Sequence, residues 1–361
     1  MSSYNSSSSS SSRCKRPRTS SLPLELHPNV LSRVPTKSLP KFRSVCKEWR
    51  DIIDDPRFAT VHAASGVESP RILLFSQPSL GAEPRFVMDE EFLETSLPRL
   101  AGGLWHCGAR ASCHGLLCFD DLRKGETCLL NPLTRDGFSL SSVAPCERPL
   151  GSHIAIGMDR LTSRYKILRV SYFRRAIGAI RAEVLDQGSQ SWREIASVPP
   201  GDILGDPVFA AGSIHWSVAS RNDALSISSF DLAKEEFGPT PCPEIQHARL
   251  VDLGGALGLV DCSREESLDV WVMEERGRWK KEYSVQQIPL LPVNKHGYLS
   301  VLGCGGRKIM VNYLGSFWFY DPATDEVKHV RRATDAGGSI TLSLLSPTKL
   351  WNGGVAEISA D

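Results

Sequence analysis

A pattern of strand, polar turn and strand recurs five times between residues 128 and 327. The turns begin at Asn131, Asp186, Asp231, Glu274 and Asp321, so successive copies are 55, 45, 43 and 47 residues apart. This spacing is close to the roughly 40–50 residues of a four-stranded propeller blade. Because one blade cannot bury both of its faces, such repeats close into a ring in which neighbouring blades cover each other. The repeat therefore predicts an all-β, propeller-like domain.

The expected β domain spans residues 68–361, where short apolar runs alternate with Gly and Pro turn signals and long helical periodicity is absent. Because the repeat is degenerate, an irregular β-sandwich or two smaller β domains remain as alternatives. Residues 71–88 and 338–351 would supply extra or closing strands, so the number of blades is left open.

A separate helical module is expected at residues 22–62. Pro35 separates its first helix from its second, and Pro56 ends the third. The apolar residues on one face of each helix are Leu26, Val30, Leu31 and Val34, then Leu39, Phe42 and Val45, then Cys46, Trp49, Ile52 and Ile53. A unit of about 40 residues seldom folds without a metal, a disulfide or a partner. We therefore expect this module to be stabilised by contacts with the rest of the chain or with another protein.

Residues 1–21 are rich in Ser and nearly free of apolar residues, which predicts a disordered tail. Lys15, Arg16 and Arg18 lie in a basic cluster that suits either a nuclear-import signal or a solvated tail. The net charge of the whole chain is only +1, so no global field attracts nucleic acid or a membrane. We expect the nucleus and/or the cytoplasm as the location, with no nucleic-acid or membrane partner.

The helical module resembles the F-box of plant F-box proteins. About forty consecutive residues match in order and spacing, from Leu22-Pro23-Leu24-Glu25-Leu26 to Asp55-Pro56-Arg57-Phe58 and His62. The β part resembles the kelch-like F-box-associated domain of the same proteins. Ser112-Cys113-His114-Gly115-Leu116-Leu117-Cys118, followed by Asn131-Pro132-Leu133-Thr134, carries that second resemblance.

The resemblance implies a substrate-recognition subunit of a Skp–cullin–F-box ubiquitin ligase. The F-box would dock a Skp-family adaptor and through it a cullin, and the β domain would hold an unidentified target protein. No catalysis and no cofactor are implied, because another subunit transfers ubiquitin. The implied adaptor contacts are Leu22, Pro23, Leu26, Leu31, Pro35, Leu39, Val45 and Cys46.

The resemblance also implies that Phe42, Trp49 and Ile53 form the internal core of the F-box. Pro28 and Pro40 depart from the family pattern. Each fits the first turn of a helix, where the missing N–H costs little, or else loosens the module and weakens docking.

Enzyme motifs are lacking in the sequence: no G-x-S-x-G, H-E-x-x-H, P-loop or dinucleotide fingerprint occurs. The ten cysteines do not have zinc-ligand spacing, and His106-Cys107 and Cys113-His114 are expected to be ordinary strand residues. We therefore expect no metal and no catalysis, with a propeller hydrolase or oxidase as a remote alternative.

A second alternative is a glycan- or small-molecule-binding propeller, in which four tryptophans would offer stacking surfaces: Trp105, Trp216, Trp271 and Trp318. For a protein target, specificity is expected in loops on one face of the ring. The candidate loops are residues 174–180, 200–206, 218–225 and 292–298.

Overall fold

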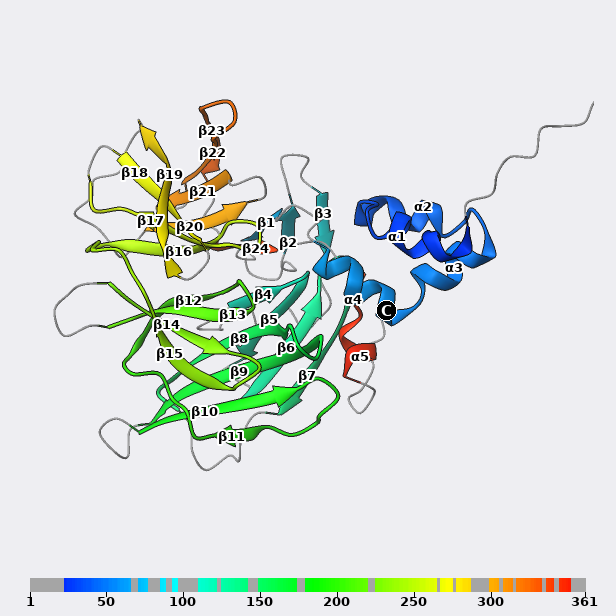
Figure 1. Cartoon of the computed structure of the whole chain (residues 1–361), viewed down its shortest axis with the longest axis horizontal. Helices are drawn as coiled ribbons and strands as arrows, with labels where there is room; N and C mark the ends of the chain where they lie inside the picture. The colour runs from blue at the N-terminus through cyan, green and yellow to red at the C-terminus, as the bar shows by residue number, and fades with distance from the viewer. Residues whose placement is uncertain are drawn as a thin grey trace, which may run out of the picture.

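The computed structural model shows a short helical module followed by a large domain of antiparallel sheets (Figure 1). The residues that it describes are 23–65, 71–76, 85–88, 93–96, 110–121, 125–141, 149–173, 179–219, 225–264, 267–274, 277–286, 299–304, 308–313, 316–332, 336–340 and 344–351. Among these residues, no helix is both long and apolar enough to cross a membrane.

The N-terminal module consists of short helical segments. They are the 3-10 turn Leu24–Leu26, α1 (His27–Leu31), the 3-10 turn Thr36–Ser38, α2 (Leu39–Phe42), α3 (Lys47–Ile53) and α4 (Pro56–Ala64). Pro28 and Pro40 both lie in the first turn of an α-helix that follows a 3-10 turn. Their missing N–H groups therefore remove no intrahelical hydrogen bond, because the first amides of a helix have no partner within it.

The helix α4 was not expected from the sequence, which only predicted that Pro56 ends the preceding helix. Pro56 instead opens α4, and the side chain of Asp55 caps the helix by accepting from the amide of Arg57 at 2.9 Å. An Asp followed by Pro is a common helix start, so this signal was present in the sequence.

The strands form six antiparallel four-stranded sheets in the described part of the chain. From the first to the fourth strand, three of the sheets are β24 (Ala336–Ile340), β1 (Arg71–Ser76), β2 (Arg85–Met88), β3 (Leu93–Ser96); β4 (Arg110–Cys113), β5 (Leu116–Asp121), β6 (Glu126–Asn131), β7 (Asp136–Ser141); and β8 (Gly151–Asp159), β9 (Arg164–Phe173), β10 (Ala179–Asp186), β11 (Arg193–Ile195). The other three are β12 (Ile203–Ala210), β13 (Ser213–Val218), β14 (Ser226–Asp231), β15 (Glu236–Thr240); β16 (Ala248–Asp252), β17 (Leu257–Asp261), β18 (Ser267–Met273), β19 (Trp279–Gln286); and β20 (Leu299–Cys304), β21 (Lys308–Tyr313), β22 (Ser316–Asp321), β23 (Glu326–Arg332).

The sheets close into a ring. The first strands contact one another in the order β24, β4, β8, β12, β16 and β20, and β20 in turn contacts β24. Each sheet is therefore a blade, and the described blades form a six-bladed propeller. The first blade is completed by the C-terminal strand β24, which pairs antiparallel with β1 from Arg71↔Ile340 to Phe75↔Ala336.

The five repeats read from the sequence are the hairpins between the third and fourth strands of five blades. Asn131, Asp231 and Asp321 accept a hydrogen bond from a backbone amide two residues later at 2.9, 2.9 and 3.0 Å. The fifth residue of these turns has a positive φ in each case: Arg135 (58°), Glu235 (59°) and Asp325 (54°). The polar residue that marks these three repeats thus fixes a turn of the same shape.

The buried core lies between neighbouring blades. One cluster of buried residues extends from β4 to the end of blade β12–β15 and includes Tyr165, Trp216 and Phe230, each with an exposed fraction of 0%. A second cluster joins the last two blades through Val270, Val285 and Ile309. Because each blade covers its neighbour's apolar face, the stability of the ring depends on the contacts between blades.

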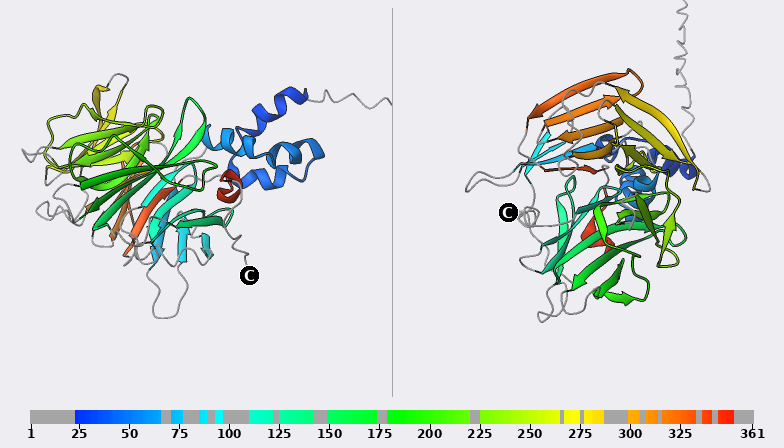
Figure 2. Two further views of the ribbon diagram at one scale, coloured as in Figure 1. Left: turned by 90° about the horizontal axis from the view of Figure 1, so that it is seen from below. Right: turned by 90° about the vertical axis from the view of Figure 1, so that its left-hand side faces the viewer.

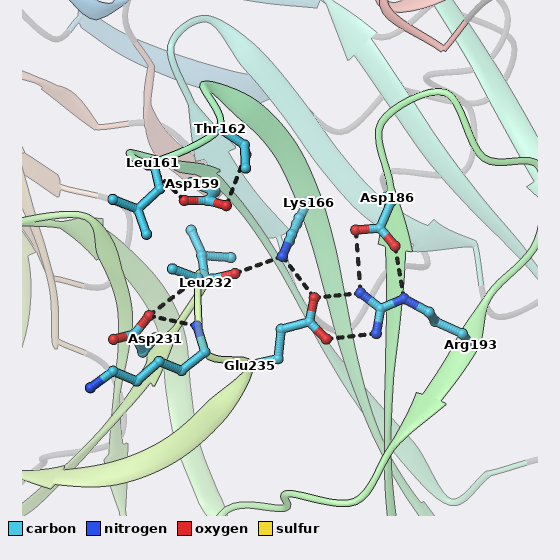
Figure 3. Close-up of polar contacts among 11 residues, drawn as sticks. Asp159, Leu161, Thr162, Lys166, Asp186, Arg193, Asp231, Leu232 and Glu235 are labelled. Carbon is cyan, nitrogen blue, oxygen red and sulfur yellow. Dashed lines mark hydrogen bonds and ion pairs between the residues drawn. The ribbon is translucent and has the colours of Figure 1, made fainter.

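An ion network reinforces one such junction (Figure 3). Glu235, in the hairpin between β14 and β15, accepts from Lys166 of β9 at 2.7 Å and from both terminal nitrogens of Arg193 in β11. Arg193 also binds Asp186 at 2.8 Å, and Lys166 donates to the carbonyl of Leu232 at 2.7 Å. The hydrogen bonds from Arg193, followed by those from Lys166, lower the pKa of Glu235 to about 2, although burial acts in the opposite direction.

The Glu235→Gln variant should lower the free energy of unfolding near neutral pH by about 1–2 kcal/mol, because Arg193 and Lys166 lose the carboxylate that joins the two blades. The folded pKa of about 2 lies below the value of about 4.3 of an unfolded Glu. This contribution is therefore present above about pH 4.3 and is lost as the pH falls toward 2.

Denaturant unfolding at neutral pH and near pH 3 measures this effect, and the difference between wild type and Glu235→Gln should narrow at the lower pH. Glu236→Gln, at the exposed neighbouring residue, is the control and should change little. A difference between wild type and Glu235→Gln that does not depend on pH would contradict the role of the network.

Candidate functional site

The helical module has a small core of its own. Leu31, Leu39, Ile53 and Phe58 form its buried cluster, and four partly buried side chains of the module pack against it: Val34, Phe42, Trp49 and Ile52. The Trp49 ring meets the Phe42 ring edge-on at 5.5 Å between centroids. The expected core residues Phe42, Trp49 and Ile53 thus all lie in or against this cluster.

Two of the expected adaptor contacts are inside the module. Leu31 and Leu39 each have an exposed fraction of 0%, so they offer no apolar surface to a partner in this structure. The resemblance implied adaptor contacts at these two positions, and that call stays a prediction. Their burial was not evident from the sequence, because helical periodicity identifies an apolar face without showing what covers it. Here the other helices of the module cover both side chains.

The other expected contacts are more accessible. Leu26 and Val45 are 44% and 62% exposed, and Pro23 and Pro35 are also exposed. Cys46 is half-buried and caps α3, with its sulfur accepting from the Trp49 amide at 3.4 Å. Leu22 and the basic residues Lys15, Arg16 and Arg18 lie outside the described residues, as does the tail at 1–21.

Exposed apolar side chains gather on this module. Five of the nine large apolar side chains that are exposed among the described residues belong to it: Leu24 (67%), Leu26, Val30 (41%), Val45 and Val61 (61%). Leu24, Val30 and Val61 were not among the predicted contacts. These side chains make the helical module the candidate interaction site among the described residues.

The C-terminal segment 344–351 joins the module to the ring. Leu344 packs against the cluster of the module, whereas Leu345, Leu350 and Trp351 belong to the core cluster of the β domain. Ala59 of α4 belongs to that same β-domain cluster. The segment therefore lies between the two units and contacts both, and Figure 1 shows its helix α5 (Pro347–Leu350) beside α4 and β7.

Polar contacts fix this segment to the blade β4–β7. Asn131 donates to the carbonyl of Leu345 at 2.8 Å. Asp136 accepts from the hydroxyl of Ser346 and from that of Thr348, the latter at 2.8 Å. Ser346 in turn caps α5 by accepting from the amide of Lys349 at 3.2 Å. The hairpin between β6 and β7 thus positions the helix that contacts the module.

On the module's side of this junction, Arg43 binds Asp54 through two hydrogen bonds of 2.7 and 2.8 Å. These bonds lower the pKa of Asp54, and the nearby charge of Lys349 acts in the same direction. A cavity of about 220 Å³ lies between the two sides and is lined by residues of the module, such as Ile53, and of the C-terminal segment, such as Leu350.

The strand directions define two ends of the ring. The hairpins that join first to second strands and third to fourth strands lie at one end, which we call the hairpin face. The module attaches here, because its anchor α5 contacts the β6–β7 hairpin. It projects from the β domain as a separate body (Figure 2).

The opposite end, which we call the loop face, carries the turns from second to third strands and the connections between blades. All four loop segments proposed from the sequence are of these two kinds, and the strand ends that flank them lie at the loop face. Much of residues 174–180 and 218–225, and all of 292–298, lie outside the described residues, whereas 200–206 is described.

The tryptophans proposed as stacking surfaces do not offer one in the described residues. Trp216 and Trp318 are buried, with exposed fractions of 0% and 6%, and Trp271 packs partly buried against a core cluster. Trp105 lies outside the described residues. Trp216 and Trp271 pack in or against core clusters, which is the usual role of such rings in blades.

The Cys113-His114 pair lies in the β4–β5 hairpin. Burial raises the pKa of the Cys113 thiol well above its ordinary value and lowers the pKa of His114 to about 4. The His114 Nδ1 is 3.0 Å from the hydroxyl of Tyr165. A thiol that stays protonated is a poor nucleophile and metal ligand. Within the described residues, no group of three or more His, Cys, Asp and Glu side chains could hold a metal.

Comparison with known proteins matches both parts of the chain. Residues 84–332 match the model of the F-box associated beta propeller domain, and residues 19–60 match that of the F-box domain. The chain belongs to the F-box proteins with an F-box-associated β-propeller. Residues 23–60 of the helical module are therefore those of the F-box, and the strands within residues 84–332 are those of the associated domain.

Relatives from Arabidopsis thaliana are F-box proteins as well. An F-box/kelch-repeat protein is 27% identical over 298 residues, which cover 73% of this chain and 79% of that protein. An F-box/LRR-repeat protein is 30% identical over 72% of this chain and 66% of its own length. An F-box protein is 26% identical over 73% of this chain and 72% of its own length. The chain is thus a plant-type F-box protein. Members of this family typically recognise substrates and are not themselves catalysts. The presence of an F-box supports, in general terms, binding to a Skp-type adaptor.

The Asp136→Ala variant should loosen the attachment of the F-box, because Ser346 and Thr348 lose their shared acceptor. The expected loss is about 1–3 kcal/mol of local stability in residues 344–351. Hydrogen exchange of the α5 amides and protease cleavage between the F-box and the propeller should both become faster.

Glu326→Ala is the matched control, because Glu326 faces Asp321 across its hairpin as Asp136 faces Asn131. Glu326 is exposed and should tolerate the change. Equal exchange rates of α5 in the two variants would contradict the anchoring role of Asp136.

Proposed function

We propose that this protein is the substrate-recognition subunit of a Skp–cullin–F-box ubiquitin ligase. The F-box docks the adaptor and through it the cullin, and the propeller holds a target protein. In this role the protein catalyses no step, because another subunit transfers ubiquitin. Its own residues bind two partners and hold them in a defined relative position.

The observation that carries this proposal is the exposed apolar surface of the F-box. Leu31 and Leu39 already complete the internal core, so Leu24, Leu26, Val30 and Val45 are left for a partner. Burial of one such side chain contributes roughly 1.5–3 kcal/mol. A few of them are enough for stable docking, because a handful of central apolar anchors supplies most of the binding energy of an interface.

The attachment of the F-box supports the same assignment of roles, with the adaptor bound by the F-box and the target bound by the propeller. The anchor α5 and the Asp136 contacts hold the F-box at the hairpin face, which leaves the loop face at the other end of the ring for a target. A ligase needs the target held at a defined distance from the transferred ubiquitin, and a fixed F-box provides that constraint. We also propose that the protein acts in the nucleus and/or the cytoplasm, on the basis of the Lys15, Arg16 and Arg18 cluster.

Co-purification of the full chain with a Skp-family adaptor tests the proposal. The double variant Leu24→Asp/Leu26→Asp should weaken binding at least about 100-fold, because two apolar anchors are replaced by charges that must be desolvated. The Val45→Asp variant should weaken it about 10-fold or more.

The matched control is Leu161→Asp, which introduces the same charge at a leucine that is 84% exposed on the propeller. This variant should bind the adaptor as the wild type does. Adaptor binding by the wild type and by all three variants alike would show that the F-box surface is not the contact. No binding even by the wild type would contradict the proposed receptor role.

A further inference from the structure

Exposed apolar side chains of the propeller concentrate at the loop face. Among the described residues of the β domain, the large ones are Leu150 (65%), Leu161 (84%), Val198 (40%) and Leu204 (52%). Leu150 and Val198 lie in connections between blades, and Leu204 lies at the start of β12, so all three belong to the loop face. Leu161 alone lies at the hairpin face, between β8 and β9.

Leu150 and Leu204 are linked through Tyr172 at the junction of two blades. The amide of Leu150 donates to the carbonyl of Tyr172 at 2.8 Å, so the two residues are neighbours in blade β8–β11. The hydroxyl of Tyr172 reaches across to the next blade and accepts from the amide of Ile203 at 3.0 Å. Tyr172 is also in edge contact with His153 at 5.8 Å. These contacts place four residues near one another at the loop face, and we call this group the Tyr172 surface: Leu150, Tyr172, Asp202 and Leu204.

A bulge presents Leu204 at this surface. The pairing of β12 with β13 shifts between Leu204 and Val208, and Gly205 within the bulge has a φ of +73°. β12 is the first strand of its blade and therefore lines the centre of the ring. Bulges re-aim side chains and are frequent next to functional sites. Here the exposed leucine lies on an inner strand rather than on a long loop.

Acidic side chains flank the exposed leucine. Asp202 and Asp206 are both exposed, two residues before and after Leu204. The backbone of Asp202 is fixed, because its carbonyl accepts from the amide of Ala219 at 2.9 Å. The neighbouring cation Arg181 lies over the Phe173 ring at 4.9 Å and within 3.7 Å of Glu194. The described part of the Tyr172 surface is thus apolar with an acidic border.

We propose that the Tyr172 surface is the docking site for a segment of the target protein that carries an apolar side chain beside a Lys or Arg. The apolar side chain packs on Leu150, Tyr172 and Leu204, and the cation pairs with Asp202. This inference rests on the proposed receptor function and adds to it the surface and the chemistry of the target. Complementary charge favours the encounter and selects the register of the bound segment.

Selection from a random-peptide phage library on the purified full chain tests the proposal. The peptides that are enriched should share an apolar residue next to Lys or Arg. Their affinity should fall at least about 10-fold for Leu204→Asp, because a buried apolar contact is replaced by a charge. Asp202→Lys should weaken the same peptides and shift a fresh selection toward Asp or Glu at the position of the basic residue.

Leu161→Asp is again the control, since it places the same charge on an exposed leucine at the hairpin face, and it should leave peptide binding unchanged. Adaptor binding by Leu204→Asp and Asp202→Lys should match that of the wild type. This second measurement separates a failure of the Tyr172 surface from a failure of the receptor role.

Three outcomes would overturn the inference. The first is that the wild type enriches no peptide, and the second is that the enriched peptides lack the apolar–basic pair. The third is that Leu204→Asp binds the enriched peptides as well as the wild type does.

Discussion

The antiparallel pairing of β24 with β1 is the interaction on which the rest of the structure depends. It joins residues 336–340 to residues 71–76 and completes the first blade from the two ends of the β domain. Without it, β1 would present an open edge, and the inner strands β4 and β20 of the adjacent blades would lose the strand that lies between them. The closure also returns the chain to the side of the F-box, so that residues 344–351 can pack between α4 and the β6–β7 hairpin.

Closure therefore couples the shape of the propeller to the position of the F-box. The F-box cluster is completed by Leu344 from the far end of the chain, and Ala59 of α4 contributes to the core of the propeller. In the proposed receptor, the two partners would therefore bind at opposite ends of the molecule. The exposed leucines of the F-box lie at one end and Leu150 and Leu204 at the other, which is the arrangement that a bridging subunit needs.

Local signals in the sequence predicted the β domain well, because Asn131, Asp231 and Asp321 each fix a turn through a hydrogen bond within the turn itself. Residues 71–88 and 338–351 were proposed as extra or closing strands, and β1, β2 and most of β24 lie in them. The number of blades was still left open, because no local pattern reports that β24 pairs with β1 across more than 250 residues. The burial of Leu31 and Leu39 depends on packing between helices, which periodicity does not contain. Helix α5 was missed although Ser346-Pro347 is a typical helix start. The Tyr172 surface was not predicted either, because it depends on the bulge in β12.

The central claim is that the F-box surface, and not the propeller, engages the adaptor. Hydrogen–deuterium exchange of the full chain, with and without a purified Skp-family adaptor, tests it most directly. The account predicts that protection on binding falls on residues 23–49 of the F-box and leaves the described strands at the loop face, including β12, unchanged. Protection of the loop face, or none on the F-box in a complex that forms, would contradict it.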